Sequence, residues 1–294
     1  MNHKRIAAAC LILGVCAYIL VRPYADFSRR RAAFGSLKDS VEAEASRFSG
    51  EAGVIIRDLG SGWEIAIGDD TTFPSASVVK IPIMAACFYA VKKGDLDLGE
   101  TITLKGAHKV LGSGVLKAKP SGEKYSVKEL IRLMIAESDN TATNILIDRL
   151  GFDYLNDMFR EMGLEDTNID RKMMDFEKRR KGIENYTSAK DIALLLDRMY
   201  RGKLIDRETS DQCIEFLKEQ RSKNRIPAKL PPDIPVAHKT GLERGICHDA
   251  GIVFTPKGDL LICVLTKHTD RSSRQAKKFI SHVAARAYYY RLQA

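Results

Sequence analysis

Short stretches of apolar, β-forming residues lie towards both ends of this chain. Residues 53–58 and 63–67 are rich in β-forming residues and are joined by a Leu-Gly-Ser-Gly turn, which predicts a hairpin. Three more β-rich stretches follow Pro235, and a Pro-Lys-Gly-Asp sequence marks a turn between the last two. These predicted strands span residues 236–240, 249–255 and 260–266.

Helical periods flank these strands and fill the middle of the chain. Apolar residues recur every three or four positions over residues 34–48, and a basic segment over residues 271–291 closes the chain as a helix. Another helix is expected over residues 77–94. Ser126 and Ser188 each open a further helix with a capping-box pattern, an acidic residue standing three positions later.

This order of elements predicts an α+β fold. One antiparallel sheet is built from both ends of the chain and flanked by terminal helices, with an all-helical lobe inserted between its halves. A chain of 294 residues is long enough for one large core or two joined lobes. We expect the folded domain over residues 34–294, the helical lobe over about 72–228, and a signal or anchor with a basic linker over 1–33.

The segment from Ile6 to Val21 is uncharged and strongly apolar, and Lys4 and Arg5 precede it. This pattern is typical of a signal peptide or a short membrane anchor, with a buried core helix as the alternative. An Arg-Pro-Tyr sequence follows in place of a clear cleavage site, which favours an uncleaved anchor. We therefore expect an extracytoplasmic protein, in the periplasm or at the cell surface, held to the membrane by residues 6–21. Basic residues on both sides leave its orientation open.

The net charge of +9 is unevenly distributed along the chain. Six basic residues against one acid place +5 of it within the first 31 residues, which leaves +4 for the rest. This balance indicates no nucleic-acid-binding surface. We expect a monomer with a small-molecule substrate.

The cysteines and histidines show no metal-ligand spacing, so neither a metal nor another cofactor is expected. Cys87 and Cys263 lie in apolar stretches and are expected in the core. Whether Cys213 pairs with Cys247 stays open. His238 and His248 lie in or beside predicted strands, and their side chains are expected to form hydrogen bonds.

The stretch over residues 75–84 holds a serine and a lysine one helical turn apart. At this spacing Ser77 and Lys80 share one face, and a neighbouring amine activates a hydroxyl by taking its proton. The amine acts as a base only when neutral, a state that burial and a second nearby cation favour. The pattern alone is weak, because Ser121 and Lys124 repeat it in a segment whose proline and glycine indicate a loop.

Two further motifs accompany this pair. Ser138-Asp139-Asn140 follows a predicted helix, and Lys239-Thr240-Gly241 lies in a predicted strand. With all three motifs in this order, the chain resembles the class A β-lactamases and their penicillin-binding relatives from about Phe34 onward. A capping sequence and an edge-strand lysine explain the two motifs singly, but neither explains the combination.

The resemblance implies a serine hydrolase that forms an acyl-enzyme on Ser77, with Lys80 as the base. Ser138 would pass a proton to the departing nitrogen, and the backbone N–H groups of Ser77 and Leu242 would form the oxyanion hole. The other implied residues hold the substrate amide or carboxylate, or let the substrate backbone approach the strand: Asn140, Lys239, Thr240 and Gly241.

Two residues beside these motifs have different expected roles. Asp139 is expected to fix the turn rather than to take part in the chemistry. Arg244 either reaches a substrate carboxylate or, like most arginines in turns, is solvated.

One part of the family's machinery is missing. Class A β-lactamases carry a loop glutamate that activates the deacylating water, followed four residues later by an asparagine. In the charged loop over residues 163–187, Asp170-Arg171 resembles the start of this segment, but the glutamate position holds Met173. Glu177 is the leading replacement among the carboxylates nearby. Acylation needs only the parts present, and deacylation is the step in question.

Three functions therefore remain open. The first is β-lactam hydrolysis with an atypical deacylation base. The second is a D-Ala-D-Ala peptidase or esterase of the penicillin-binding type. The third is a membrane-tethered β-lactam sensor that acylates without turnover.

Overall fold

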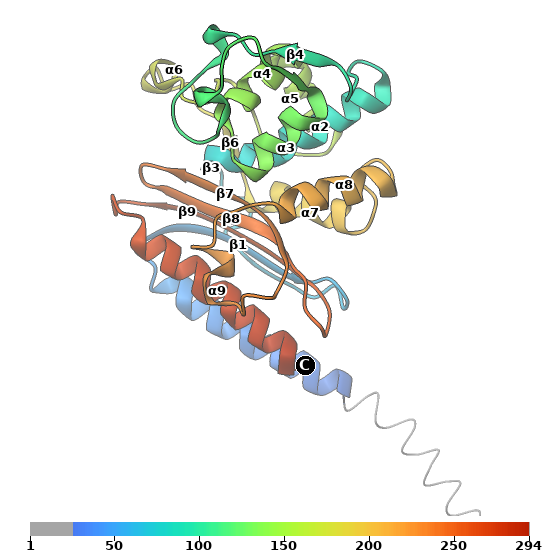
Figure 1. The fold of residues 1–294 in the computed structure, drawn as a ribbon. Helices are drawn as coiled ribbons and strands as arrows, with labels where there is room; N and C mark the ends of the chain where they lie inside the picture. Colours follow the sequence, from blue (N-terminus) through green and yellow to red (C-terminus); the bar gives the residue numbers. More distant parts are fainter. Residues whose placement is uncertain (1–25, 294) are drawn as a thin grey trace, which may run out of the picture.

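The computed structural model describes residues 26–293, which form two lobes, and helices of one lobe pack on a face of the five-stranded sheet in the other (Figure 1). One lobe contains the sheet and the two terminal helices, and the other is helical. The predicted membrane anchor over residues 6–21 lies outside the described residues. Among residues 26–293, no helix has the length and apolar character needed to span a membrane.

The sheet is antiparallel throughout and joins strands from both ends of the chain, as the sequence pattern predicts. Its strand order is β2-β1-β9-β8-β7, with Val54 of β1 opposite Val264 of β9. The strands span Gly50–Asp58 (β1), Glu64–Ile67 (β2), Val236–Glu243 (β7), Ile246–Val253 (β8) and Leu260–His268 (β9). The α+β fold is therefore confirmed.

The two terminal helices run side by side along one face of the sheet (Figure 1). One covers residues 26–46 and the other, α9, covers Arg274–Gln293. Phe34, Val41 and Phe279 are buried with the sheet residues on this face. The first helix includes residues 26–33, ahead of its predicted start at residue 34. Contacts with the hairpin explain the difference, because the Phe27 and Trp63 ring centroids lie 5.5 Å apart.

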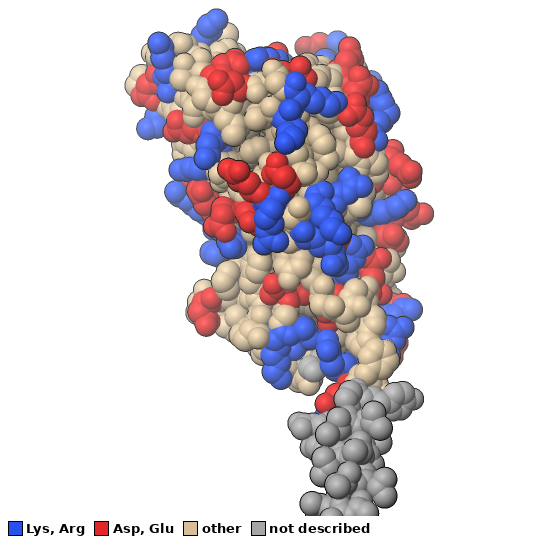
Figure 2. Space-filling model, turned by 90° about the vertical axis from the view of Figure 1, so that its right-hand side faces the viewer, with Lys and Arg blue, Asp and Glu red and all other residues tan. Residues whose placement is uncertain are grey.

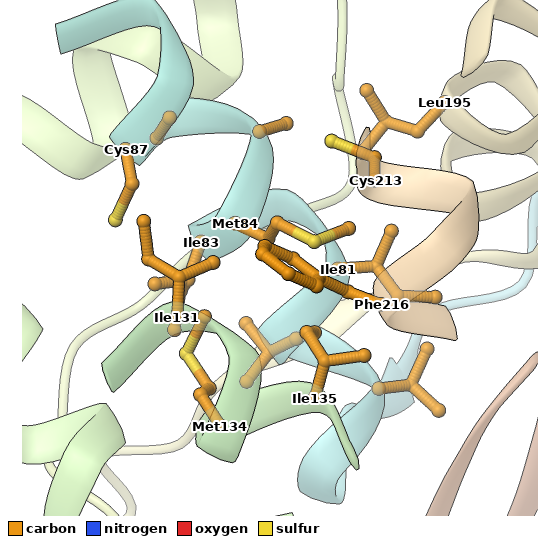
Figure 3. Close-up of a cluster of buried hydrophobic side chains, with 14 of the residues drawn as sticks. Ile81, Ile83, Met84, Cys87, Ile131, Met134, Ile135, Leu195, Cys213 and Phe216 are labelled. Carbon is orange, nitrogen blue, oxygen red and sulfur yellow. The ribbon is translucent and has the colours of Figure 1, made fainter. Parts of the chain in front are cut away.

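The helical lobe packs around α2 on the other side of the molecule. Figure 3 shows aliphatic and sulfur-containing side chains of α2 packing with those of α3, α7 and α8, including Phe216. The helices span Lys80–Lys93 (α2), Val127–Ala136 (α3), Asn140–Leu150 (α4), Phe152–Glu161 (α5), Phe176–Arg180 (α6), Ala189–Tyr200 (α7) and Arg207–Lys218 (α8). The predicted caps are present, since the hydroxyls of Ser126 and Ser188 accept from the backbone N–H three residues later.

Short two-stranded ladders connect the loops of this lobe. β3 (Phe73–Pro74) pairs with β6 (Tyr186–Thr187), and β4 (Thr101–Thr103) pairs with β5 (Lys124–Ser126). Short 3₁₀ turns at Gly106–His108 (η2), Leu116–Ala118 (η3) and Ile226–Lys229 (η4) lie in the connections. The β3–β6 ladder fixes the end of the 163–187 loop beside the segment that leads to Ser77.

The four described cysteines are buried and free. Cys87 and Cys263 lie in the core as expected, and burial raises the pKa of Cys87 to about 12. Cys213 and Cys247 are not paired, which answers the question that the sequence left open. The fold is therefore held together by packing and hydrogen bonds rather than by disulfides.

Candidate active site

Ser77 lies in the 3₁₀ turn η1 (Ala76–Val79), immediately before α2, rather than within the predicted α-helix. It borders a cavity of about 360 Å³ between the two lobes. Ala76, just before it, has a φ of 46°, a left-handed conformation that costs a residue with a side chain of order 1 kcal/mol. Val78 and Val79 are fully buried and anchor the turn against the core. The strained backbone therefore holds the hydroxyl at a fixed place on the cavity wall.

The Lys80 amine is fully buried and donates three hydrogen bonds. They reach the Ser138 carbonyl at 2.7 Å, the Asn140 Oδ1 at 2.8 Å and the Ser138 Oγ at 3.2 Å. Burial and the charge of Lys239 hold the pKa of Lys80 well below its usual value, against a smaller opposing effect of Asp139. The lowered pKa favours the neutral form of the Lys80 amine.

A neutral Lys80 amine keeps two N–H donors and gains one lone pair. The Ser138 carbonyl and the Asn140 Oδ1 can only accept, so they occupy the two donors. The lone pair is then left for a hydroxyl. This arrangement gives Lys80 the form that a general base for a serine requires.

Ser138 joins this amine to a second one. Lys239 on β7 donates to the Ser138 Oγ at 2.9 Å and to the Thr240 carbonyl at 2.9 Å. Burial and the neighbouring Arg225 lower the pKa of Lys239 to about 7, and Asp249 opposes this shift. The two amines therefore meet at the Ser138 hydroxyl, as predicted. The Ser77 hydroxyl, the fourth predicted member of this cluster, borders the cavity and forms no hydrogen bond to these groups within the described residues.

Asp139 fixes the backbone around this hydroxyl. Its buried carboxylate accepts from the N–H groups of Val115 at 2.6 Å, Leu116 at 2.8 Å and Ala142 at 2.9 Å. It thus caps α4 and ties down the loop before β5, a wider task than fixing the local turn. Ser138 itself has a φ of 51°, so its side chain and its carbonyl both meet the Lys80 amine.

Strand β7 brings the third motif against η1. A Cβ on Gly241 would lie 3.2 Å from Val78 Cγ2 and 3.3 Å from Ala76 Cβ, so glycine permits this close approach. Leu242, the next residue, borders the same cavity as Ser77. The two backbone N–H groups expected to form the oxyanion hole thus belong to neighbouring segments of one wall.

The loop over residues 163–187 closes the cavity with an apolar wall. Met173 and Met174 both line it. The buried Asn144 holds Met173 from both sides, accepting from its N–H at 2.8 Å and donating to its carbonyl at 3.1 Å. Asn144 thus fixes the backbone of Met173, the residue that the sequence comparison predicts at the position of the family's water-activating glutamate.

Glu177 does not lie in this cavity. It is on the solvent side of α6, where its side chain is 69% exposed and pairs with Lys181 at 2.8 Å. A helix of five residues turns it away from the cleft that Phe176 and Arg179 border. Glu177 as the deacylation base is therefore a prediction that this placement contradicts.

The other carboxylates nearby are bound to arginines. Glu184 pairs with Arg171 at 2.6 Å and with Arg179 at 3.2 Å. Glu243, which borders the cavity, pairs with Arg179 at 2.8 Å and with Arg171 at 3.2 Å. The four side chains form an ion network that joins the loop to the end of β7.

Sequence reasoning missed several of these residues. Nothing in the local pattern singled out Asn144, Arg179, Arg225 or Glu243, since their roles depend on contacts far along the chain. Arg244 was noted and is exposed at the cavity rim.

The two strand histidines are hydrogen-bonded, as predicted. His238 meets the buried Asp249 at 2.8 Å. His248 meets the Pro74 carbonyl at 2.9 Å and accepts from the Thr266 N–H at 3.0 Å, and burial lowers its pKa to about 4. His248 is therefore a neutral structural residue behind η1.

The sequence model of a family described as "Beta-lactamase enzyme family" matches residues 36–291. The chain belongs to the β-lactamase enzyme family. It is a serine hydrolase of the β-lactamase type, as the three motifs predict.

Three similar proteins illustrate the relationship. This β-lactamase family member is 27% identical to the extended-spectrum β-lactamase PER-1 of Pseudomonas aeruginosa, over 87% of this chain and 88% of PER-1. A β-lactamase structure from Sphaerobacter thermophilus is 31% identical with a TM-score of 0.79, covering 89% of this chain and 98% of that one. The structure of PBP-A is 31% identical with a TM-score of 0.80, covering 88% of this chain and 97% of PBP-A.

Proposed function

We propose that this enzyme is acylated on Ser77 by β-lactams and that hydrolysis of the resulting ester limits its turnover. The observation that carries the proposal is Met173, which lines the cavity where class A β-lactamases carry their water-activating glutamate. The reaction is β-lactam ring hydrolysis in which opening of the ring is fast and release of the product is slow.

The contacts around Lys80 support a direct route for acylation. The neutral amine takes the proton of Ser77, whose oxygen attacks the lactam carbonyl carbon. The N–H groups of Ser77 and Leu242 stabilise the oxyanion. As the C–N bond breaks, a proton passes from Lys80 through the Ser138 hydroxyl to the nitrogen, and protonated Lys239 holds the substrate carboxylate.

Deacylation lacks an evident base. A thioether is a weak acceptor and takes no proton from water near neutral pH. Glu177 is solvated, and the carboxylates of Glu184 and Glu243 are each held by two arginines, so neither is free to position a water molecule. Loss of a positioned base slows such a step by about 10²- to 10⁴-fold.

A second candidate is cleavage of cell-wall peptides that end in D-amino acids. The same acylation residues can act on a peptide carbonyl. An apolar Met173 is consistent with an enzyme whose function does not require fast release of a β-lactam. The likeness to PBP-A supports acylation by β-lactams in either case, because a mutant of PBP-A forms an acyl-enzyme complex with penicillin G. A tethered sensor that acylates once and stops is the extreme of the same behaviour.

The test is intact-mass and turnover measurement with a chromogenic cephalosporin. We expect a burst of one equivalent with a stable adduct on Ser77, followed by a slow steady rate. A steady rate without burst or adduct would overturn slow deacylation, and turnover by an enzyme that never carries the adduct on Ser77 would overturn the assignment. A complete stop after the burst would favour the sensor. Release of D-alanine from a D-Ala-D-Ala peptide would favour the peptidase.

We also propose that residues 6–21 anchor a monomeric enzyme in a membrane with its domain outside the cytoplasm. The uncharged apolar run and its basic flanks support this proposal. Recovery of the full chain in the membrane fraction after an alkaline carbonate wash is expected. Recovery in the soluble fraction would refute anchoring.

A further inference from the structure

The loop between β4 and β5 carries an unusual concentration of positive charge. Residues 105–119 contain four lysines and no acidic residue: Lys105, Lys109, Lys117 and Lys119. The same loop supplies Gly112 and Ser113 to the wall of the Ser77 cavity. The Lys117 amine donates to the Gly112 carbonyl, so the positive charge of the loop begins next to the cavity wall.

These four lysines have no acidic partner. Among residues 26–293, none of them forms a salt bridge, whereas many other surface lysines and arginines do. Lys109 donates to the Lys119 carbonyl, and Lys117 donates to the Gly112 carbonyl, so the loop is compact and keeps its charges close together. By contrast, basic and acidic side chains are interspersed over the face shown in Figure 2.

His108 of this loop lies near a lysine of the neighbouring loop whose charge is compensated by an aspartate. Besides burial, the charges of Lys105 and Lys172 lower the pKa of His108, against the opposing charge of Asp148. Lys105 and Lys172 therefore lie close enough to act on the same imidazole. Asp148 is itself paired with Lys172.

Arg244 adds a cation across the cavity and forms no salt bridge within the described residues. The acids near the entrance, Glu177, Glu184 and Glu243, are already paired with basic residues. The mouth of the site therefore presents uncompensated positive charge from more than one side.

Apolar side chains lie among these lysines. Leu111 is 78% exposed and Val115 is 39% exposed. A small anionic substrate needs one cation, the role expected of Lys239. Several unpaired cations with apolar groups between them suit a ligand with repeated carboxylates and small apolar side chains.

We propose that the 105–119 loop docks the carboxylate-bearing peptide stems of peptidoglycan beside the Ser77 cavity. The inference rests on the proposed function in its second form, cleavage of cell-wall peptides, because peptidoglycan is the polymer that carries those peptides. Long-range attraction raises the local concentration of an anionic ligand and weakens as salt increases.

Binding is measured by co-sedimentation of the full chain with purified sacculi, using Ser77→Ala so that acylation plays no part. The test variant combines Lys105→Gln with Lys119→Gln, whose side chains are exposed. The control combines Lys203→Gln with Lys223→Gln, which removes the same charge from exposed positions that also lack salt bridges within residues 26–293.

We expect the test variant to bind roughly 3- to 10-fold more weakly at low salt, and the control to stay within about two-fold of the parent. The difference should vanish at about 0.5 M salt. Sacculi whose carboxylates have been amidated should bind all proteins equally weakly.

An equal loss of binding in the control, or undiminished binding to amidated sacculi, would overturn the proposal. So would a loss of binding that persists at high salt. Acylation of the Lys105→Gln/Lys119→Gln protein with Ser77 restored is measured separately with a small β-lactam. Failure of the proposed function appears there as a missing adduct, whatever the sacculi show.

Discussion

The amine of Lys239 donates a hydrogen bond of 2.9 Å to the hydroxyl of Ser138, although 101 residues separate them along the chain. The same hydroxyl also accepts a hydrogen bond of 3.2 Å from the Lys80 amine. One serine of the helical lobe therefore connects the base beside Ser77 with the cation of the sheet. We predict that proton transfer and carboxylate binding both involve this hydroxyl, and we expect changes to either amine to affect both.

Replacement of Ser77 by alanine is expected to abolish acylation, because Ser77 is the predicted nucleophile and borders the same cavity as Leu242, the other expected oxyanion donor. Intact-mass measurement after incubation with a β-lactam should show no adduct. Ser121→Ala is the matched control, since Ser121 repeats the Ser-x-x-Lys spacing but lies in an exposed turn. An adduct that persists in Ser77→Ala, or is lost in Ser121→Ala, contradicts the assignment.

Replacement of Met173 by glutamate is expected to speed deacylation by about 100-fold, because it puts a carboxylate on the cavity wall at the position that Asn144 holds. The decay of the acyl-enzyme is followed by mass spectrometry after excess β-lactam is removed. Met173→Gln has the same shape without the base and should leave the decay unchanged. Equal acceleration in both variants would show that size, rather than a base, limits the step.

Replacement of Glu177 by glutamine is expected to change acylation and deacylation by less than about two-fold. The carboxylate faces solvent and only pairs with Lys181, so its removal costs at most the energy of a surface ion pair. Single-turnover kinetics with the same β-lactam provide the measurement. A large fall in the deacylation rate would restore Glu177 as the base.

The rate of acylation should depend on pH through Lys239. Its pKa is lowered to about 7, so the free enzyme loses this positive charge as pH rises through that value. Since an anionic β-lactam pairs with the protonated amine, the second-order rate constant of acylation should fall above about pH 7.

Lys239→Arg tests this explanation, because guanidinium remains charged across the accessible range. The alkaline fall should flatten in the variant even where its absolute rate is lower. An unchanged alkaline fall would assign the titration to another group.

Replacement of Asp139 by alanine is expected to destabilise the protein by about 3–5 kcal/mol, since three N–H groups lose their acceptor and each unsatisfied buried donor costs about 1–3 kcal/mol. Urea unfolding gives the value. Ser126→Ala removes a simple helix cap and should cost only about 1 kcal/mol. Similar losses in both variants would mean that the loop contacts of Asp139 contribute little.

The sequence predicted features that are set by neighbours along the chain. The caps at Ser126 and Ser188 are local hydrogen bonds, and the missing glutamate is visible at Met173 because the motif itself is local. The sheet from both chain ends followed from the periods of its strands. The expectation that the three motifs lie together in the folded protein came from the family resemblance.

Features that depend on distant contacts were not predictable in the same way. Glu177 lies on the short helix α6, and only the packing of that helix decides that Phe176 and Arg179, rather than Glu177, border the cavity. The helical conformation of residues 26–33 depends on packing such as that of Phe27 on Trp63. Arg179 and Glu243 meet only after the loop and β7 have folded together.

The position of β9 between β1 and β8 also bears on how the enzyme is made. A chain that stops after α8 holds Ser77, Lys80 and Ser138 but has no Lys239, and its β1 hairpin keeps one open edge. The active site is therefore complete only after β7 has been synthesised. A prematurely terminated product exposes a strand edge that can pair with other chains. Such a fragment is expected to aggregate rather than to persist as a weakened enzyme.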